Sequence, residues 1–408
     1  MGVVVTDAGT LAALVAVTGG VVLGTISGLT PGLHANNFAL LLAAAAPAIP
    51  GPRRFVGAAM LAAGVVHTFL DVVPALALGV PDPAMAASAL PGHRLVLRGR
   101  GREALRLSAL GSALAVAAAV PLALPVTWVM ERAYPAIEAN LPAVLAAVAV
   151  GLVLAERSQR ARIGGGIALA ASGLLGAATL DLSTGGLPAG GTLAPLFAGL
   201  FGAPVLIEAV GEEGVPPQAG AGVTSSRGFV GATALLGTLS GAVVGYLPGV
   251  SSAVAATGAL SVLPASGRGP RAYLVVTSGV NTANTLFALA ALVALGDPRT
   301  GVLVALDGAG VPLNLPLFVA SATVAAAAGF VLVPAAGDRY LAAASRVDPT
   351  RLSVGVLALL CAVVGALSGA VGLGIFAAST AVGLVPARFG ARRATLMGVL
   401  LVPLALGV

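Results

Sequence analysis

The feature that most constrains this chain is its succession of long apolar stretches, separated by short segments that hold most of the charged residues. Only 9% of the 408 residues are charged, whereas 58% are hydrophobic. A soluble domain carries about 25% charged residues, so this chain has too few to cover its surface in water. Because one bilayer span needs about 20 apolar residues, the length allows about ten to twelve spans. The sequence therefore predicts an all-α, polytopic protein of the cell membrane.

The net charge of +6 does not indicate nucleic-acid binding. All 21 basic residues are arginines, and most of them lie between apolar stretches. Such a distribution is typical of signals that orient spans beside anionic headgroups. The single cysteine, Cys361, lies in an apolar run, which excludes a disulfide framework and a Cys-rich metal site. The amino terminus lacks the basic region of a signal peptide, so the first apolar run is predicted to be a retained span.

The arginine-rich segments 94–106 and 157–162 are separated by two predicted spans. Both are therefore expected on the same side of the membrane, and the positive-inside rule makes it the cytoplasmic side. Arg53 and Arg54 do not fit this count if the span at about 55–80 crosses the membrane once.

An internal repeat is the most informative pattern in the chain. The pentapeptide Gly-Thr-Ile-Ser-Gly at residues 24–28 recurs as Gly-Thr-Leu-Ser-Gly at residues 237–241. A Pro-Gly pair follows each copy, at residues 31–32 and 248–249. Because the two spacings differ by four residues, about one helical turn, the same helix face follows in both copies.

Further residues keep equal distances behind the two Pro-Gly pairs. Pro47 and Pro264 stand equally far behind the first proline of their pair, and so do Arg54 and Arg271. Several coincidences in one order are hard to obtain by drift, so we interpret them as a true repeat.

The repeat predicts two halves of related structure. The halves are residues 1–210 and 211–408, with the repeats at about 18–83 and 231–298. If the segment 31–50 crosses the membrane, the number of crossings between the repeats is odd, and the second repeat is inverted relative to the first. Inverted repeats would place the two equivalent arginines on opposite faces and supply two alternating-access states.

Each Pro-Gly pair is predicted to end one helix and begin another within the membrane. Proline lacks an N–H donor and glycine frees φ, so Pro31 and Gly32, like Pro248 and Gly249, should interrupt a helix. The N-terminus of the next helix presents unpaired donors and the positive end of a dipole, which favours an anionic group. An ordinary proline kink is the alternative, but matched breaks in two repeats favour a transporter binding site.

Polar residues gather behind these breaks and in the second arm of each repeat. Amide and hydroxyl groups bind carboxylates, or coordinate sodium, at lower cost than a buried charge; helix–helix hydrogen bonding is the alternative role. We expect Asn281→Ala to weaken transport and Ser108→Ala to have no effect. The predicted substrate-binding residues are Pro31, Gly32, Asn36, Asn37, Pro248, Gly249, Ser251, Ser252, Asn281 and Asn284.

A second set of polar residues is predicted to bind the coupling ion or proton: His67, Asp71 and Thr282. A carboxylate in an apolar stretch is costly and by default indicates function. His67 and Asp71 are four residues apart and share one helix face, where they form either a proton-sensitive pair or a satisfied ion pair. Asp181 and Glu208 are expected at the membrane interface.

The motifs of common membrane enzymes and ATPases are absent from the sequence. The chain has no lysine, which excludes a Walker A motif, and its three histidines do not form His-Glu-x-x-His. We therefore expect no enzymatic activity, no bound metal and no cofactor other than a coupling Na⁺ or H⁺.

These motifs resemble the TctA family, the large permease subunit of tripartite tricarboxylate transporters. The resemblance rests on residues 24–33 and 237–250, and on a central segment, Asp-Leu-Ser-Thr-Gly-Gly at 181–186 followed by residues 193–202. It implies uptake of a small carboxylate, driven by a sodium or proton gradient, through an elevator-like movement. The expected partners are a small membrane subunit and an extracytoplasmic binding protein, and a homodimer is one possible assembly.

The chain departs from the family in two respects. It is short, and the acidic Glu-x-x-Asn-Asn stretch of the second repeat is reduced to residues 281–284. Two alternatives stay open. One is a lipid-phosphate translocase, because the Pro-Gly-Val-Ser-Ser sequence at 248–252 also fits phosphate at a helix N-terminus. The other is a non-transporting subunit of a larger membrane complex.

Overall fold

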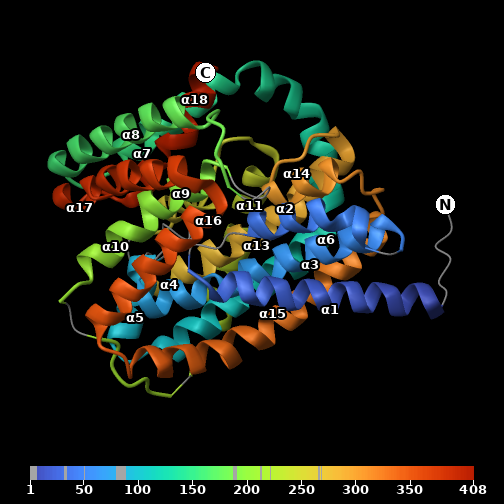
Figure 1. The fold of residues 1–408 in the computed structure, drawn as a ribbon, viewed down its shortest axis with the longest axis horizontal. Helices are drawn as coiled ribbons and strands as arrows, with labels where there is room; N and C mark the ends of the chain where they lie inside the picture. The colour runs from blue at the N-terminus through green and yellow to red at the C-terminus, as the bar shows by residue number, and fades with distance from the viewer. Residues whose placement is uncertain are drawn as a thin grey trace.

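The computed structural model describes residues 7–31, 35–49, 51–79, 89–186, 191–211, 214–220, 222–264, 267 and 269–408. Within these ranges the regular structure is entirely helical (Figure 1). Eight of the described helices are long and apolar enough to cross a membrane, and four shorter apolar helices accompany them. The predicted all-α polytopic class is confirmed, and the four shorter helices are each too short to cross a membrane alone.

The helices fall into two related series and a third group. The first series is α1 (Asp7–Leu29), α2 (Ala35–Ala45), α3 (Arg53–Leu70), α4 (Val72–Leu78), α5 (Ala89–Leu97) and α6 (Gly101–Ala139). The second series is α11 (Arg227–Tyr246), α12 (Ser252–Ser261), α13 (Pro270–Leu295), α14 (Gly301–Gly308) and α15 (Leu315–Ala344).

The third group comes from the middle and the end of the chain, and α7, α8, α17 and α18 lie together at the upper left of Figure 1. Its helices are α7 (Leu141–Leu154), α8 (Gln159–Thr179), α9 (Leu193–Phe197), the π-helix η3 (Ala198–Gly202), α10 (Ala203–Glu208), α16 (Pro349–Gly383), α17 (Val385–Phe389), the 3₁₀-helix η5 (Arg393–Met397) and α18 (Gly398–Leu406). Helix α16 is broken at Gly369, where φ is +62° and the Gly185 carbonyl occupies the space that a side chain would need.

Glycines bring the first and third helices of each series into close contact. The glycines of α1 that face α3 are Gly20, Gly24 and Gly28, and those of α11 that face α13 are Gly237, Gly241 and Gly245. A methyl group on Gly24 would lie 2.5 Å from the Ala63 carbonyl oxygen, and one on Gly237 would lie 2.6 Å from that of Val276. Small residues allow this approach, which stabilises helix pairs where lipid provides no hydrophobic drive between them.

The glycine contacts fix the register between the repeats. Gly20 contacts Ala59 of α3, and Gly237 contacts Val276 of α13. The difference in residue number between Gly20 and Gly237 equals that between Ala59 and Val276, so this offset relates equivalent positions of the two repeats. The same offset relates the two Pro-Gly pairs, the starts of α2 and α12, and the glycines that end α4 and α13 in the left-handed conformation. The pentapeptide alignment, which pairs Gly24 with Gly237, is therefore wrong by one turn. Glycines recur every four residues in both helices, so this motif alone cannot fix the register.

Helix α3 begins at the end of the molecule where α15 also begins. The Arg53 guanidinium donates to the carbonyl oxygen of Ala309, just before α15, at 3.3 Å. Gly57, one turn into α3, packs against Phe318 in the first turn of α15. The two helices therefore start side by side.

Helix α13 begins at the opposite end. Arg271, in its first turn, pairs with Glu103 in the first turn of α6 at 2.9 Å. The neighbouring Arg102 pairs with Asp338, near the end of α15, at 3.5 Å. Because α13 starts where α15 ends and α3 starts where α15 begins, the equivalent helices run in opposite directions. The predicted inversion is thus observed, and it explains why Arg54 breaks the charge count.

We expect the glycine contacts to be necessary for stable folding. Replacing Gly24 by Val forces side-chain atoms against the α3 backbone, and overpacking of this kind costs about 1–3 kcal/mol or more. Gly19 lies in the same helix with open space around its Cβ position, so Gly19→Val is the matched control. Thermal unfolding of the purified variants in detergent should show a lower midpoint for Gly24→Val alone; equal midpoints would contradict the packing argument.

The inverted arrangement also predicts the sides from which two positions are labelled. In a Cys361→Ser background, Arg54→Cys and Arg102→Cys should react with a membrane-impermeant maleimide from opposite sides of oriented vesicles, because their helices α3 and α6 start at opposite ends. The positive-inside rule predicts that position 102 faces the cytoplasm. Labelling of both from one side would contradict the placement of α3 and α6 from which the inversion is derived.

Candidate functional site

A group of buried polar residues lies where α3 and α13 cross. Asn281 of α13 donates a hydrogen bond from Nδ2 to Oδ2 of Asp71 at 2.7 Å, and the hydroxyls of Thr68 and Thr282 lie 3.1 Å apart. Asp71 is 4% exposed and Asn281 6%. Because α3 and α13 are equivalent helices of two inverted repeats, this crossing lies at the interface between the repeats.

Asp71 occupies the junction of α3 and α4, within an apolar stretch from Arg53 to Leu78 long enough to span a bilayer. Its backbone N–H donates to the His67 carbonyl oxygen at 2.9 Å, so the chain stays helical through the junction. A carboxylate in such surroundings requires hydrogen-bond donors, because burial without them is costly. The Asn281 amide is one such donor, and it comes from the other repeat.

His67 extends the site toward α1. Its Nδ1 lies 2.9 Å from the hydroxyl oxygen of Ser27, which also donates to the Gly24 carbonyl oxygen at 3.1 Å. The imidazole is 3% exposed. The site thus joins two helices of the first repeat to one helix of the second.

Helix α6 contributes two hydroxyls that the sequence did not reveal. The Ser108 and Ser278 hydroxyls lie 2.7 Å apart, and Thr282 donates to the Ser112 hydroxyl at 2.8 Å. Ser112 donates in turn to the Ser278 carbonyl oxygen at 3.3 Å. The Ser108 hydroxyl thus belongs to a buried network, and that Ser108→Ala leaves transport unchanged stays a prediction. The available signal was the four-residue spacing of Ser108 and Ser112, which places both on one helix face.

Two buried oxygens on α13 have no hydrogen-bond partner among the described residues: Oδ1 of Asn284 and Oγ1 of Thr277. Asn284 lies three residues after Asn281 and Thr277 four before it, so the three side chains share one face of the helix. The offset between the repeats makes Asn284 the counterpart of His67. A buried acceptor left unpaired costs free energy and requires an explanation, such as a bound ion or water.

The second Pro-Gly break is seated against the third helix group. Gly249 has φ of +80°, and its Cβ position would lie 2.6 Å from Leu404 of α18. Ser251 caps α12 by accepting a hydrogen bond from the Val254 N–H at 3.4 Å, and Ser252 is buried. Helix α12 therefore begins directly after the break, as predicted.

The first break is described only in part. Pro31 is buried after the end of α1, and α2 begins four residues later. Gly32 and the side chains of Asn36 and Asn37 lie outside the described residues. The structure thus brings Asp71, Asn281 and Thr282 to one crossing, with His67 one turn before Asp71 and Asn284 about one turn after Asn281. That the residues at the two breaks line the same cavity stays a prediction.

The two acidic residues expected at the membrane interface are both exposed. Asp181 follows the end of α8, and Glu208 ends α10. Glu208 accepts a hydrogen bond from the Arg393 guanidinium at 2.7 Å. Neither carboxylate contributes to the crossing, where Asp71 is the acidic residue among those described.

Inverted repeats and a buried polar crossing between them are features of membrane transporters. The chain matches the model of the tripartite tricarboxylate transporter TctA family over residues 14–398. It belongs to this family, and the resemblance found in the sequence is confirmed. The chain is therefore a membrane component of a tripartite tricarboxylate transporter, a system that includes other subunits and a solute-binding protein.

A relative is found in an archaeon. An uncharacterised protein of Methanocaldococcus jannaschii is 27% identical over 301 residues, which cover 73% of this chain and 74% of that protein. No solved structure is matched.

The Asp71–Asn281 pair should contribute measurably to stability. Asn281→Ala leaves a buried carboxylate without one of its donors, which costs about 1–3 kcal/mol. Ser261→Ala is the control, because that exposed hydroxyl donates to a carbonyl of its own helix. In a double-mutant cycle on thermal or denaturant unfolding, Asn281→Ala should cost less when Asp71 is already Ala. Strict additivity would show that the two side chains do not interact.

Proposed function

We propose that this chain is a secondary active transporter of a small organic carboxylate, coupled to a gradient of Na⁺ or H⁺. The observation that carries the proposal is the buried Asp71–Asn281 pair, at 2.7 Å, where the equivalent helices of two inverted repeats cross. Family membership supports tricarboxylate transport as the setting. The solute, the coupling ion and the type of movement are proposals.

The position of the pair suits alternating access. Inverted repeats supply two states by exchanging the conformations of their halves, and sites near their interface are reached from either side in turn. Asp71 and Asn281 come from different repeats, so exchange of the repeat conformations alters the surroundings of both. A group bound there is transferred from one side to the other.

Asp71 is the proposed coupling residue, with His67 and Thr282 beside it. An ionisable group inside a membrane span marks an ion or proton pathway. Carboxylate, amide and hydroxyl oxygens are the ligands that hard cations prefer, and the unpaired oxygen of Asn284 lies one turn from Asn281. A cation or proton taken up at Asp71 neutralises the carboxylate before an anionic solute enters.

The solute is proposed to bind at the N-termini of α2 and α12, which follow the two Pro-Gly breaks. Free N–H donors and the helix dipole favour a carboxylate there. The break at Gly249 rests on α7 and α18, so these helices are the proposed static support for an elevator-like movement. The proposed solute-binding residues are Pro31, Gly32, Asn36, Asn37, Pro248, Gly249, Ser251, Ser252, Asn281 and Asn284.

The test is uptake by proteoliposomes. Purified protein is reconstituted and supplied with labelled di- and tricarboxylates under an imposed sodium or proton gradient, with and without its binding protein. Asp71→Asn should reduce gradient-driven accumulation by about tenfold or more, because a neutral side chain cannot take up the coupling charge.

The matched control is Asp181→Asn, since Asp181 is exposed and lies outside the crossing. It should accumulate solute at the wild-type rate. Undiminished accumulation by a stably folded Asp71→Asn variant would exclude Asp71 as the coupling residue. Loss of accumulation in both variants would indicate that removing either carboxylate impairs the protein, whether or not it lies at the crossing.

A further inference from the structure

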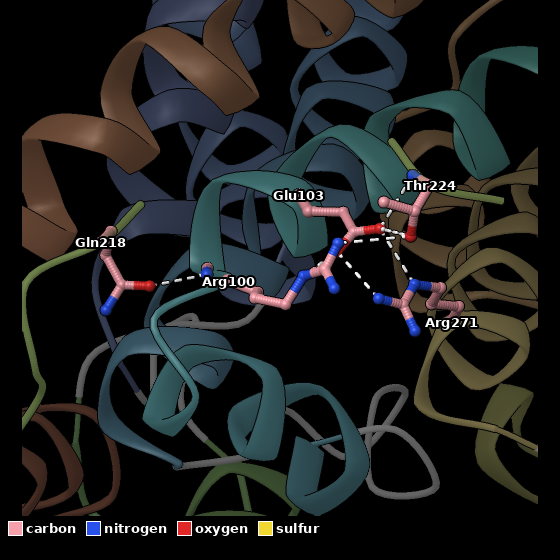
Figure 2. Close-up of polar contacts among 6 residues, drawn as sticks. Arg100, Glu103, Gln218, Thr224 and Arg271 are labelled. Carbon is pink, nitrogen blue, oxygen red and sulfur yellow. Dashed lines mark hydrogen bonds and ion pairs between the residues drawn. The ribbon is translucent and has the colours of Figure 1, made fainter. Parts of the chain in front are cut away.

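A second buried carboxylate, Glu103, lies in the first turn of α6 and is surrounded by polar partners (Figure 2). Its side chain is 1% exposed, accepts hydrogen bonds from Arg271 and Thr224, and forms an ion pair with Arg100. Arg271 donates from Nε at 2.9 Å and from Nη2 at 3.1 Å, and Arg100 Nε lies 2.7 Å away. The backbone N–H and the hydroxyl of Thr224 donate at 3.1 and 2.8 Å.

Glu103 lies where the N-terminal ends of three helices meet. Glu103 itself lies in the first turn of α6, and Arg271 in the first turn of α13. Thr224 lies two residues before Ser226, which caps α11. A negative charge near helix N-termini is favourable, so one carboxylate stabilises the start of several helices at once.

The same cluster fastens the segment that connects the two halves. This connecting segment, residues 209–226, follows the end of α10, and its described residues form no helix. Gln218 accepts a hydrogen bond from the Gly101 N–H at 2.6 Å and donates to the Val96 carbonyl oxygen at 3.1 Å. These bonds and the Thr224 contacts hold the connecting segment across the ends of α5 and α6.

The opposite end of the molecule holds a different polar contact. There the buried guanidinium of Arg299 donates to the Tyr134 hydroxyl at 2.5 Å and pairs with the exposed Asp297 at 2.9 Å. Arg54, the counterpart of Arg271, is exposed, and its guanidinium stacks over the ring of Phe55 at 5.1 Å. The first turn of α15, residues 315–318, contains no acidic residue. The Glu103 cluster, with its buried carboxylate, therefore has no copy at the equivalent positions of the other repeat.

We propose that Glu103 is a latch that keeps the arginine-rich end closed, and that Arg271 and Thr224 must leave it when this end opens. The proposal rests on the proposed alternating access. Two inverted repeats give states of similar energy, so a buried carboxylate cluster with no symmetry-related copy biases the balance between them. Loss of the latch shifts the population toward the state open at that end.

The surroundings of Glu103 distinguish it from an ordinary surface charge. A buried carboxylate is tolerated only with its partners in place, because removal of one leaves an uncompensated charge. The cluster therefore holds or separates as a unit. The adjacent Arg102–Asp338 pair, in which both side chains are 43% exposed, is of the type that contributes little.

The experiment measures accessibility at both ends in a Cys361→Ser background. Ala272→Cys reports on the arginine-rich end, because Ala272 is fully buried beside Arg271, and Ala58→Cys reports on the opposite end, near the start of α3. In oriented vesicles, Glu103→Gln and Thr224→Val should each raise the rate at which an impermeant maleimide labels position 272. An increase of about tenfold is expected from loss of a hydrogen bond to a charged group.

The control is Arg102→Ala, which should leave both labelling rates within about twofold of wild type, as expected for a surface ion pair. Labelling at position 58 must not rise in the latch variants, because a rise at both ends indicates loosening. Unchanged labelling at 272, or a parallel rise at both positions, overturns the proposal. If Glu103→Gln cannot be purified folded, Thr224→Val decides, because it removes only a hydroxyl from the cluster.

The labelling needs no substrate, so it is independent of the uptake assay. A shift at position 272 supports the latch even if no tested carboxylate is transported. Carboxylate uptake without any change in the labelling rate at position 272 supports transport and overturns the latch proposal.

Discussion

The close approach of α1 to α3 and of α11 to α13 is the constraint on which the rest of the structure depends. Lipid is as apolar as the side chains, so these helices associate through backbone contact and packing. At Gly24 and Gly237 the neighbouring carbonyl oxygen occupies the space that a Cβ atom would need. With each pair held in this way, the opposite faces of α3 and α13 meet each other and α6, and the polar crossing forms there.

The sequence predicted those parts of the fold that rest on local chemistry. Low charge content predicted membrane helices, and each Pro-Gly pair predicted a helix that begins just behind it. The grouping of Asp71 with Asn281 was within reach, because both are costly residues in apolar runs. The register between the two repeats could not be predicted, because Gly20 and Gly24 look alike in sequence. Only their contacts with α3 distinguish them.

Other residues were missed because their role depends on distant parts of the chain. Ser108 was chosen as a neutral position, yet its hydroxyl lies beside that of Ser278, 170 residues away. Glu103 stands among arginines in a segment typical of a membrane interface. Its burial requires Thr224, 121 residues further on, and no local pattern predicts that contact.

His67 and Asp71 show how the two halves of the chain have diverged. Their counterparts in the second repeat, in the register that the glycine contacts fix, are Asn284 and Ala288, neither of which ionises. The crossing therefore has titratable side chains in one arm and neutral side chains at the equivalent positions of the other. Under the proposed alternating access, exchange of the arm conformations would restore the backbone arrangement but not the distribution of charge. The coupling charge would then be loaded and unloaded at the His67–Asp71 pair of one arm, which would bound the coupling stoichiometry that two chemically equivalent arms leave open.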